Sequence, residues 1–100
     1  MSREGARRYL VCYDIPDDRR RNRIAKKLES YGDRIQYSVF VVDVKPARLV
    51  RLRSDLRTLI IPSEDSILLC DLGPLTSDWD GRFGFIGVDR PITSNTSIIA

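Results

Sequence analysis

Short segments with β-type alternation recur along this chain, and their order constrains its fold more than any other feature. The first covers residues 8–14, the second residues 33–44 and the third residues 66–72. Both faces of the first are apolar enough to be buried. The second is long enough for one strand or for two strands broken near Ser38, and no Gly or Asn marks a hairpin turn, so both alternatives stay open.

Segments with helical spacing occupy the intervals between these strands. Pro16 sets a turn after the first strand, Asp17 or Asp18 suits the N-cap position, and Gly32 is a stop signal, which predicts an amphipathic helix of about 13 residues. Pro46 suits the first turn of a second helix. The apolar stripes are Ile24, Ala25, Leu28 and Tyr31 in the first helix and Leu49, Leu52, Leu56 and Leu59 in the second.

This order of elements matches the ferredoxin-like βαββαβ plan, an α+β sandwich in which two helices cover one face of an antiparallel sheet. The opposite face then needs a cover, and a homodimer formed through that face is the simplest answer for so small a chain. We expect a single domain over residues 1–90 and a polar tail over residues 91–100.

Residues 82–88 read as a short extra C-terminal strand, interrupted by Gly84 and Gly87. Such a strand beyond the core is most easily explained if it adds to the edge of a partner's sheet. The alternative for the last residues is a frayed terminus. Trp79, in the turn before this segment, is expected to pack against the loop.

Composition excludes several classes of protein. The chain has no histidine, which removes catalytic triads built on that residue. Cys12 and Cys70 lie in apolar runs without metal-ligand spacing, so we expect buried thiols, no disulfide and no zinc. No apolar run approaches the roughly 20 residues needed to cross a bilayer, and the N-terminus lacks a signal-peptide core, so a cytoplasmic protein without a membrane partner is expected.

Charge is distributed unevenly. Residues 1–57 hold 15 Lys or Arg against 8 Asp or Glu, whereas residues 58–100 hold 2 against 6. Of the 17 basic residues 14 are Arg, the residue type that suits bidentate contacts to phosphate. The first half therefore indicates a polyanionic partner, with a solvated basic surface as the alternative.

The charge concentrates where the first strand ends at Asp14 and the first helix begins. Arg19, Arg20 and Arg21 lie in the first helical turn and Arg23 follows, although cations are unfavourable at the positive end of a helix dipole. Their placement is explained if an anion docks there. The alternative is that their stems cover apolar surface while the charges reach water.

At these residues the chain resembles the CRISPR-associated Cas-two family, the small protein of the spacer-acquisition machinery. The resemblance is carried by Tyr13-Asp14-Ile15, Asp18, Arg21-Asn22-Arg23, Leu28, Gly32 and, above all, Arg34-Ile35-Gln36-Tyr37-Ser38-Val39-Phe40. It is close over residues 8–45 and looser to about residue 90, with no departure at the motif positions. It implies a ferredoxin-like homodimer that binds duplex DNA and acts with the Cas-one integrase, and also a metal-dependent endonuclease on RNA or DNA.

The resemblance also assigns roles. Asp14 is the family's strand-end aspartate and Tyr13 the tyrosine before it, while Arg21, Arg23 and Arg34 match its arginines. Because Mg²⁺ prefers about six oxygens, one Asp14 is too few, and its copy across a two-fold axis would supply a second carboxylate. In that scheme the catalytic residues are Asp14, which is the metal ligand, and Tyr13 or Ser38, which orients water or substrate, while Arg21, Arg23 and Arg34 hold phosphates. Arg19 and Arg20 are added as nucleic-acid contacts by their place at the start of the helix.

Two alternatives remain at these positions. Asp14 could instead be a turn acid that bonds the amides near Asp17. Gln36, Ser38 and Phe40 alternate, which places them on one sheet face as interface or core residues rather than catalysts. Three functions follow: a DNA-binding scaffold without turnover, a Mg²⁺-dependent phosphodiesterase, and a small-molecule regulatory domain, which the arginine clusters and the lack of a Gly-rich loop disfavour.

Overall fold

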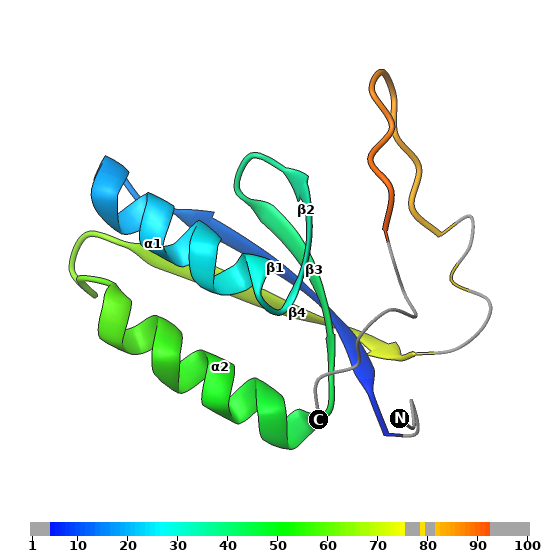
Figure 1. The fold of residues 1–100 in the computed structure, drawn as a ribbon, viewed down its shortest axis with the longest axis horizontal. Helices are drawn as coiled ribbons and strands as arrows, with labels where there is room; N and C mark the ends of the chain where they lie inside the picture. The colour runs from blue at the N-terminus through cyan, green and yellow to red at the C-terminus, as the bar shows by residue number, and fades with distance from the viewer. Residues whose placement is uncertain (1–4, 76–78, 80–81, 93–100) are drawn as a thin grey trace.

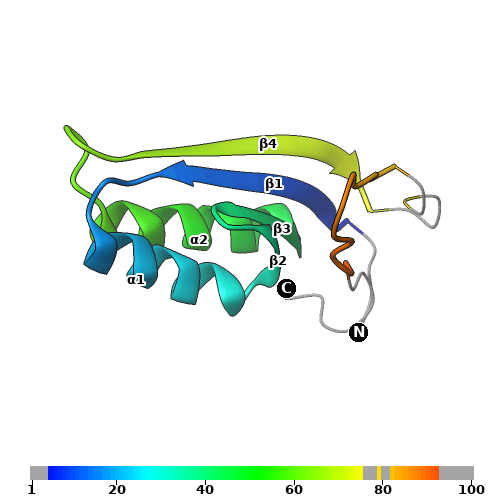
Figure 2. The ribbon, with the colours of Figure 1, turned by 90° about the horizontal axis from the view of Figure 1, so that it is seen from above.

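Four antiparallel strands and two helices make up the computed structural model, which describes residues 5–75, 79 and 82–92. In chain order the elements are β1 (Arg7–Asp14), α1 (Asp18–Glu29), β2 (Gly32–Gln36), β3 (Val39–Val44), α2 (Pro46–Leu59) and β4 (Ser66–Pro74). The strands lie in the order β2-β3-β1-β4, and both helices cover the same face of the sheet (Figures 1 and 2). The predicted βαββαβ fold is therefore confirmed.

The core lies between this face of the sheet and the two helices. Alternation along β1 points Tyr9, Val11 and Tyr13 toward the helices, and the two helical stripes meet them. The largest fully buried side chains are Phe40, Ile24, Leu28, Leu52, Val11, Val42 and Val44. Because each such side chain contributes about 1.5–3 kcal/mol when it is fully buried, this single core accounts for most of the apolar drive to fold.

The segment 33–44 forms two strands joined by a tight turn at Tyr37 and Ser38. A register shift between Arg34 and Gln36 accompanies the turn. The expectation that Gln36 and Phe40 share one face is therefore wrong, because the turn and the shift break the alternation. Phe40 is fully buried in the core, so of its two predicted roles the core role holds, while Gln36 is exposed on the other side of the sheet.

The start of α1 confirms the predicted N-cap, whereas the end of α1 differs from the predicted stop at Gly32. Asp17 is the N-cap, and its carboxylate accepts a hydrogen bond of 2.9 Å from the amide of Arg20. The helix ends at Glu29 with Ser30 as C-cap, and Gly32 is already the first residue of β2. Gly32 is thus not a helix stop; what requires glycine there is the close approach of β3.

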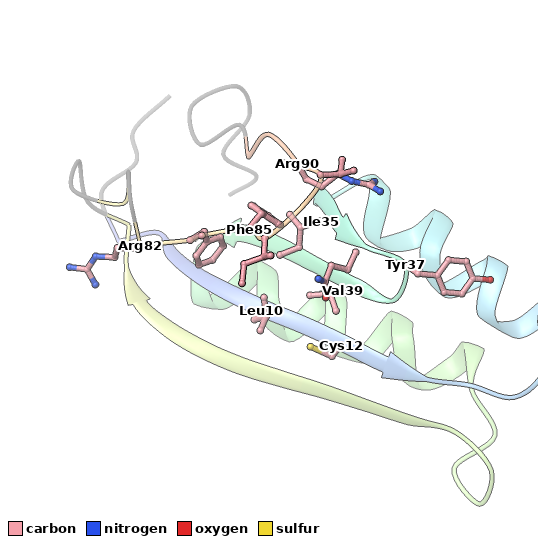
Figure 3. Close-up of a pocket in the computed structure, with 13 residues that line it drawn as sticks. Leu10, Cys12, Ile35, Tyr37, Val39, Arg82, Phe85 and Arg90 are labelled. Carbon is pink, nitrogen blue, oxygen red and sulfur yellow. The ribbon is translucent and has the colours of Figure 1, made fainter.

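The second face of the sheet, which we call the open face, carries no helix. Cys12 on this face is half-buried and Cys70 is exposed, so within a single chain the prediction that both thiols and both faces of β1 are buried does not hold. Residues 82–90 instead pass over one end of the open face and leave a groove of about 820 Å³ (Figure 3).

Residues 82–92, which include the predicted extra C-terminal strand, form no strand in this structure. A strand needs a hydrogen-bonded neighbour, and Gly84 and Gly87 weaken the segment further. Residues 93–100 of the predicted tail lie outside the described residues. Within the described ranges, neither helix has the length and apolar character needed to cross a bilayer.

Candidate nucleic-acid site at the end of the first strand

Asp14 is the last residue of β1 and lies opposite Ser66, the first residue of β4. Its carboxylate is exposed and forms no hydrogen bond or ion pair with the part of the chain that the structure describes. Asp17 takes the capping role instead, so the turn-acid alternative for Asp14 is wrong. An exposed, uncommitted carboxylate at a strand end is free to bind a ligand.

Arg21 reaches back from α1 to the end of β1. Its Nη1 donates to the carbonyl of Ile15 at 2.8 Å, its Nε donates to the hydroxyl of Tyr37 at 3.3 Å, and it forms an ion pair with Asp18. The hydrogen bond to Tyr37, assisted by that to Asp18, holds the pKa of this guanidinium above its usual value. Arg21 is therefore a permanently charged group fixed beside the residue that follows Asp14.

Arg34 approaches the same strand end from β2. Its Nε donates to the carbonyl of Tyr37 at 2.9 Å, and its Nη2 donates to the hydroxyl of Tyr13 at 3.3 Å. Tyr13 in turn donates from its hydroxyl to the same carbonyl at 3.2 Å. Asp14 consequently lies between Tyr13, which contacts Arg34, and Ile15, which contacts Arg21.

Tyr13 and Ser38 take part in hydrogen bonds that connect β1 to the turn between β2 and β3. Tyr13 is buried, and its hydroxyl is already bonded on both sides. Ser38 is half-buried, and its carbonyl accepts a hydrogen bond of 3.1 Å from the amide of Tyr13. Both residues connect β1 to the turn between β2 and β3, and these contacts support a positioning role for them.

Arg20 is occupied elsewhere, contrary to its predicted role as a phosphate contact. Its Nε and Nη2 donate to the two carboxylate oxygens of Asp65 at 2.7 and 3.0 Å, and Nη2 also reaches Glu64 at 3.1 Å. The side chain of Asp65 is fully buried and also accepts from the amide of Ile61 at 2.9 Å. Arg20 therefore fastens the loop between α2 and β4 to the start of α1. Of the other predicted contacts, Arg19 and Arg23 are exposed.

The Arg20–Asp65 pair predicts an acid-sensitive stability. Hydrogen bonding to Arg20 lowers the pKa of Asp65 below its usual value, so the pair stabilises the fold fully above the unfolded pKa of about 3.9 and loses its effect as pH falls through the lower folded pKa. Asp65→Asn should therefore be less stable than wild type at pH 7, and chemical denaturation at a series of pH values should show the difference narrowing below about pH 4.

Glu64→Gln is the matched control for this prediction. Glu64 bonds the same guanidinium, but its side chain is 55% exposed, so its loss should change stability less. A gap between wild type and Asp65→Asn that stays constant down to pH 2 would contradict the assignment.

The donor groups that the structure describes in a single chain do not complete a metal site. Within residues 5–75, 79 and 82–92, no group of three or more Cys, Asp or Glu side chains is placed to hold an ion. One chain contributes the exposed Asp14 carboxylate, which suits a hard cation such as Mg²⁺ but is by itself one ligand. The residues fit such an ion if a second carboxylate arrives from another chain.

Two features escaped prediction from sequence. Tyr37 connects Arg21 to Arg34, and the only local signal for it is a tyrosine inside a β-rich segment. Arg8 and Asp43, which oppose each other in β1 and β3, form a buried ion pair with bonds of 2.7 Å, against which Trp79 packs. The predicted packing role of Trp79 is thus confirmed.

Fold and site together define a class of protein: a small ferredoxin-like α+β protein with an exposed carboxylate at a strand end and two arginines fixed on the residues that flank it. The family model described as CRISPR associated protein Cas2 matches residues 7–80. The chain therefore belongs to the Cas2 family, and the resemblance seen in the sequence is confirmed.

Individual relatives agree with this assignment. Over 95 residues the chain is 43% identical to CRISPR-associated endoribonuclease Cas2 3 of Rhodospirillum rubrum, covering 90% of this chain and 97% of that protein. It is 44% identical over 87 residues to CRISPR-associated endoribonuclease Cas2 of Chlorobaculum tepidum, covering 82% and 88%. The crystal structure of Streptococcus pyogenes Cas2 superposes with a TM-score of 0.69 at 32% identity, covering 80% of this chain and 99% of that one.

Proposed function

We propose that the protein acts in CRISPR spacer acquisition as a homodimer that binds duplex DNA, and that it also hydrolyses phosphodiester bonds in RNA or DNA with Mg²⁺. The observation that carries the proposal is the exposed Asp14 carboxylate at a strand end whose flanking residues, Tyr13 and Ile15, contact Arg34 and Arg21. Guanidinium groups suit phosphate oxygens and a carboxylate suits a cation, so this site matches a nucleic-acid backbone with a bound metal ion.

The homodimer is supported by the open face. Leu68 and Ile86 on or above this face are 61% and 106% exposed, and the groove beside them is lined by Leu10, Ile35 and Val39. An exposed apolar surface of this kind favours association. If the two-fold axis passes near Asp14, the two copies supply two carboxylates to one Mg²⁺, which would activate water and neutralise phosphate charge when bound. Tyr13 and Ser38 would then hold the end of β1 and the β2–β3 turn in fixed positions next to the substrate.

A Cas-one partner is supported by a structural neighbour. A partial Cas6–RT–Cas1–Cas2 complex contains a chain that superposes with a TM-score of 0.60 at 36% identity, covering 66% of this chain and 73% of that one. We therefore include the Cas-one integrase among the partners of this protein.

The second candidate function is a dimeric DNA-binding scaffold without turnover. It is favoured by the presence of a single uncommitted carboxylate in the site, since two like charges brought across an axis repel unless a cation or a proton lies between them. Arg19, Arg21, Arg23 and Arg34 would serve this function equally well, because backbone binding needs positive charge and no metal.

The deciding experiment compares wild type with Asp14→Asn, using Asp89→Asn, an exposed acid on the segment 82–92, as the matched control. Mg²⁺-dependent cleavage of duplex DNA and of RNA is measured beside spacer integration with the cognate Cas-one protein. The enzymatic proposal expects Asp14→Asn to lose cleavage while Asp89→Asn retains it. Highly purified wild type without cleavage, and with integration supported by both variants, would leave the scaffold function alone.

The salt dependence of the affinity tests whether the protein binds duplex DNA through the phosphate backbone. Because the contacts are to phosphate, affinity for duplex DNA should fall steeply between about 50 and 200 mM salt and show little sequence preference. Arg21→Gln should lower the affinity and the salt slope together, because its acidic partner Asp18 is 83% exposed and screened by solvent. Arg20→Gln should leave the slope unchanged, because the charge of Arg20 is compensated by the fully buried side chain of Asp65. A salt-independent affinity would contradict backbone binding.

A further inference from the structure

Tyr37 is the most exposed aromatic side chain of the strand-end site. It lies at the tip of the turn between β2 and β3, and 66% of its surface is accessible. Tyr37 lines one end of the groove that Ile35 and Val39 also line, and in Figure 3 its ring extends away from the other lining side chains. A large apolar ring in this position contributes little to the core, so its exposure calls for another explanation.

Two guanidinium groups hold this exposed ring. The central carbon of Arg34 lies 5.2 Å from the ring centroid, and that of Arg21 lies 5.8 Å from it, both within the range of cation–π attraction. Arg21 also donates to the hydroxyl of Tyr37 and Arg34 to its carbonyl. The ring is consequently oriented before any ligand arrives, which lowers the entropy that binding would lose.

An oriented aromatic ring beside two cations has the chemistry of a nucleotide site. Nucleobases stack on aromatic side chains, and guanidinium groups bind the phosphates that follow along the same strand. Bases inside a duplex are already stacked on each other and cannot reach such a ring. The arrangement therefore suits a nucleotide that is unpaired, in a single strand or at a frayed end.

We propose that Tyr37 is a stacking platform for an unpaired base, placed so that Arg21 and Arg34 hold the adjoining phosphates. This proposal rests on the proposed nucleic-acid function and deepens it with a base-contacting residue, whose ligand must be an unpaired nucleotide. It also gives Tyr37 a contact with the ligand that is distinct from the backbone contacts of the arginines.

The test measures the affinity of wild type, Tyr37→Leu and Tyr37→Phe for three labelled probes: a 12-nucleotide single strand of RNA, the same strand of DNA, and a blunt duplex. Because stacking contributes about 1–3 kcal/mol per base, Tyr37→Leu should bind one or both single strands about 5- to 150-fold more weakly. It should bind the duplex nearly as wild type does. Tyr37→Phe keeps the ring and loses only the hydroxyl contact to Arg21, so it should stay close to wild type on every probe.

Each outcome is decisive. Equal losses for Tyr37→Leu and Tyr37→Phe on single strands would show that the hydroxyl positions Arg21, and would overturn the stacking role. Unchanged single-strand binding by Tyr37→Leu would also overturn it while leaving duplex binding, and thus the proposed function, intact. Failure of wild type to bind any probe would remove both proposals. Thermal melts of both variants establish that the exposed site tolerates the changes.

Discussion

Replacing Arg8 with alanine should destabilise the protein by about 3–5 kcal/mol, because it would leave the Asp43 carboxylate buried without its partner. Arg8 donates to both carboxylate oxygens at 2.7 Å, and the two side chains are only 3% and 10% exposed. The guanidinium also lies 4.8 Å from the ring centroid of Trp79 and 5.9 Å from that of Phe83. One substitution therefore removes a buried ion pair and the contacts of Arg8 with the rings of Trp79 and Phe83.

Urea denaturation gives the free energy of unfolding, and the fluorescence of Trp79, the single tryptophan, reports its local environment. The matched control is the double variant Arg8→Met with Asp43→Leu, which removes both charges and keeps comparable volume. Since well-packed apolar replacements of buried ion pairs are often neutral or stabilising, the double variant should recover most of the loss. A double variant as unstable as Arg8→Ala would show that packing around Trp79, rather than the unpaired carboxylate, dominates.

Gly32→Ala should have the second largest effect on stability. A Cβ atom at Gly32 would lie 2.0 Å from the backbone carbonyl oxygen of Val41 and 3.0 Å from the Cα of Val42. Backbone atoms of a paired strand cannot move aside as a flexible side chain can, so β2 must shift away from β3. The expected loss is at or above the upper end of the range of about 1–3 kcal/mol for overpacking.

Gly84→Ala is the control for this substitution, because a Cβ atom there meets nothing within 4 Å. It should change the free energy of unfolding by about 0.5 kcal/mol or less. Since β2 carries Arg34, the Gly32→Ala shift should also weaken the contacts of Arg34 with Tyr13 and Tyr37, and duplex DNA binding should fall with stability. Full stability in Gly32→Ala would mean that β2 and β3 pair less closely than the structure shows.

Local chemistry explains which features were predictable. The strand-end position of Asp14, the N-cap Asp17 and the start of α2 at Pro46 each depend on neighbours within a few residues, so sequence patterns report them. The break of the segment 33–44 at Tyr37 and Ser38 was open in the sequence. Its turn contains neither Gly nor Asn, and the hydrogen bond from Tyr13 to Ser38 that holds it comes from another strand.

The positions of the arginines in the chain did not predict which of them are ion-paired and which are exposed. Arg20, Arg21 and Arg23 lie within four residues of each other, yet Arg20 is held by Asp65, 45 residues away, whereas Arg23 stays exposed. Tyr37 was likewise expected to be an ordinary strand residue, and its contacts with Arg21 and Arg34 come from two different elements.

By itself the sequence determined the order of the helices and strand segments, the sheet-facing stripe of each helix and the place of the acidic strand end, because periodicity and capping act over a few residues. Only the tertiary structure decided which charges remain available to a ligand, why Gly32 must be glycine and how Tyr37 is oriented. The physical reason is that ion pairs, close backbone approach and ring stacking join residues that are distant in sequence, and no local pattern encodes which partner each residue meets.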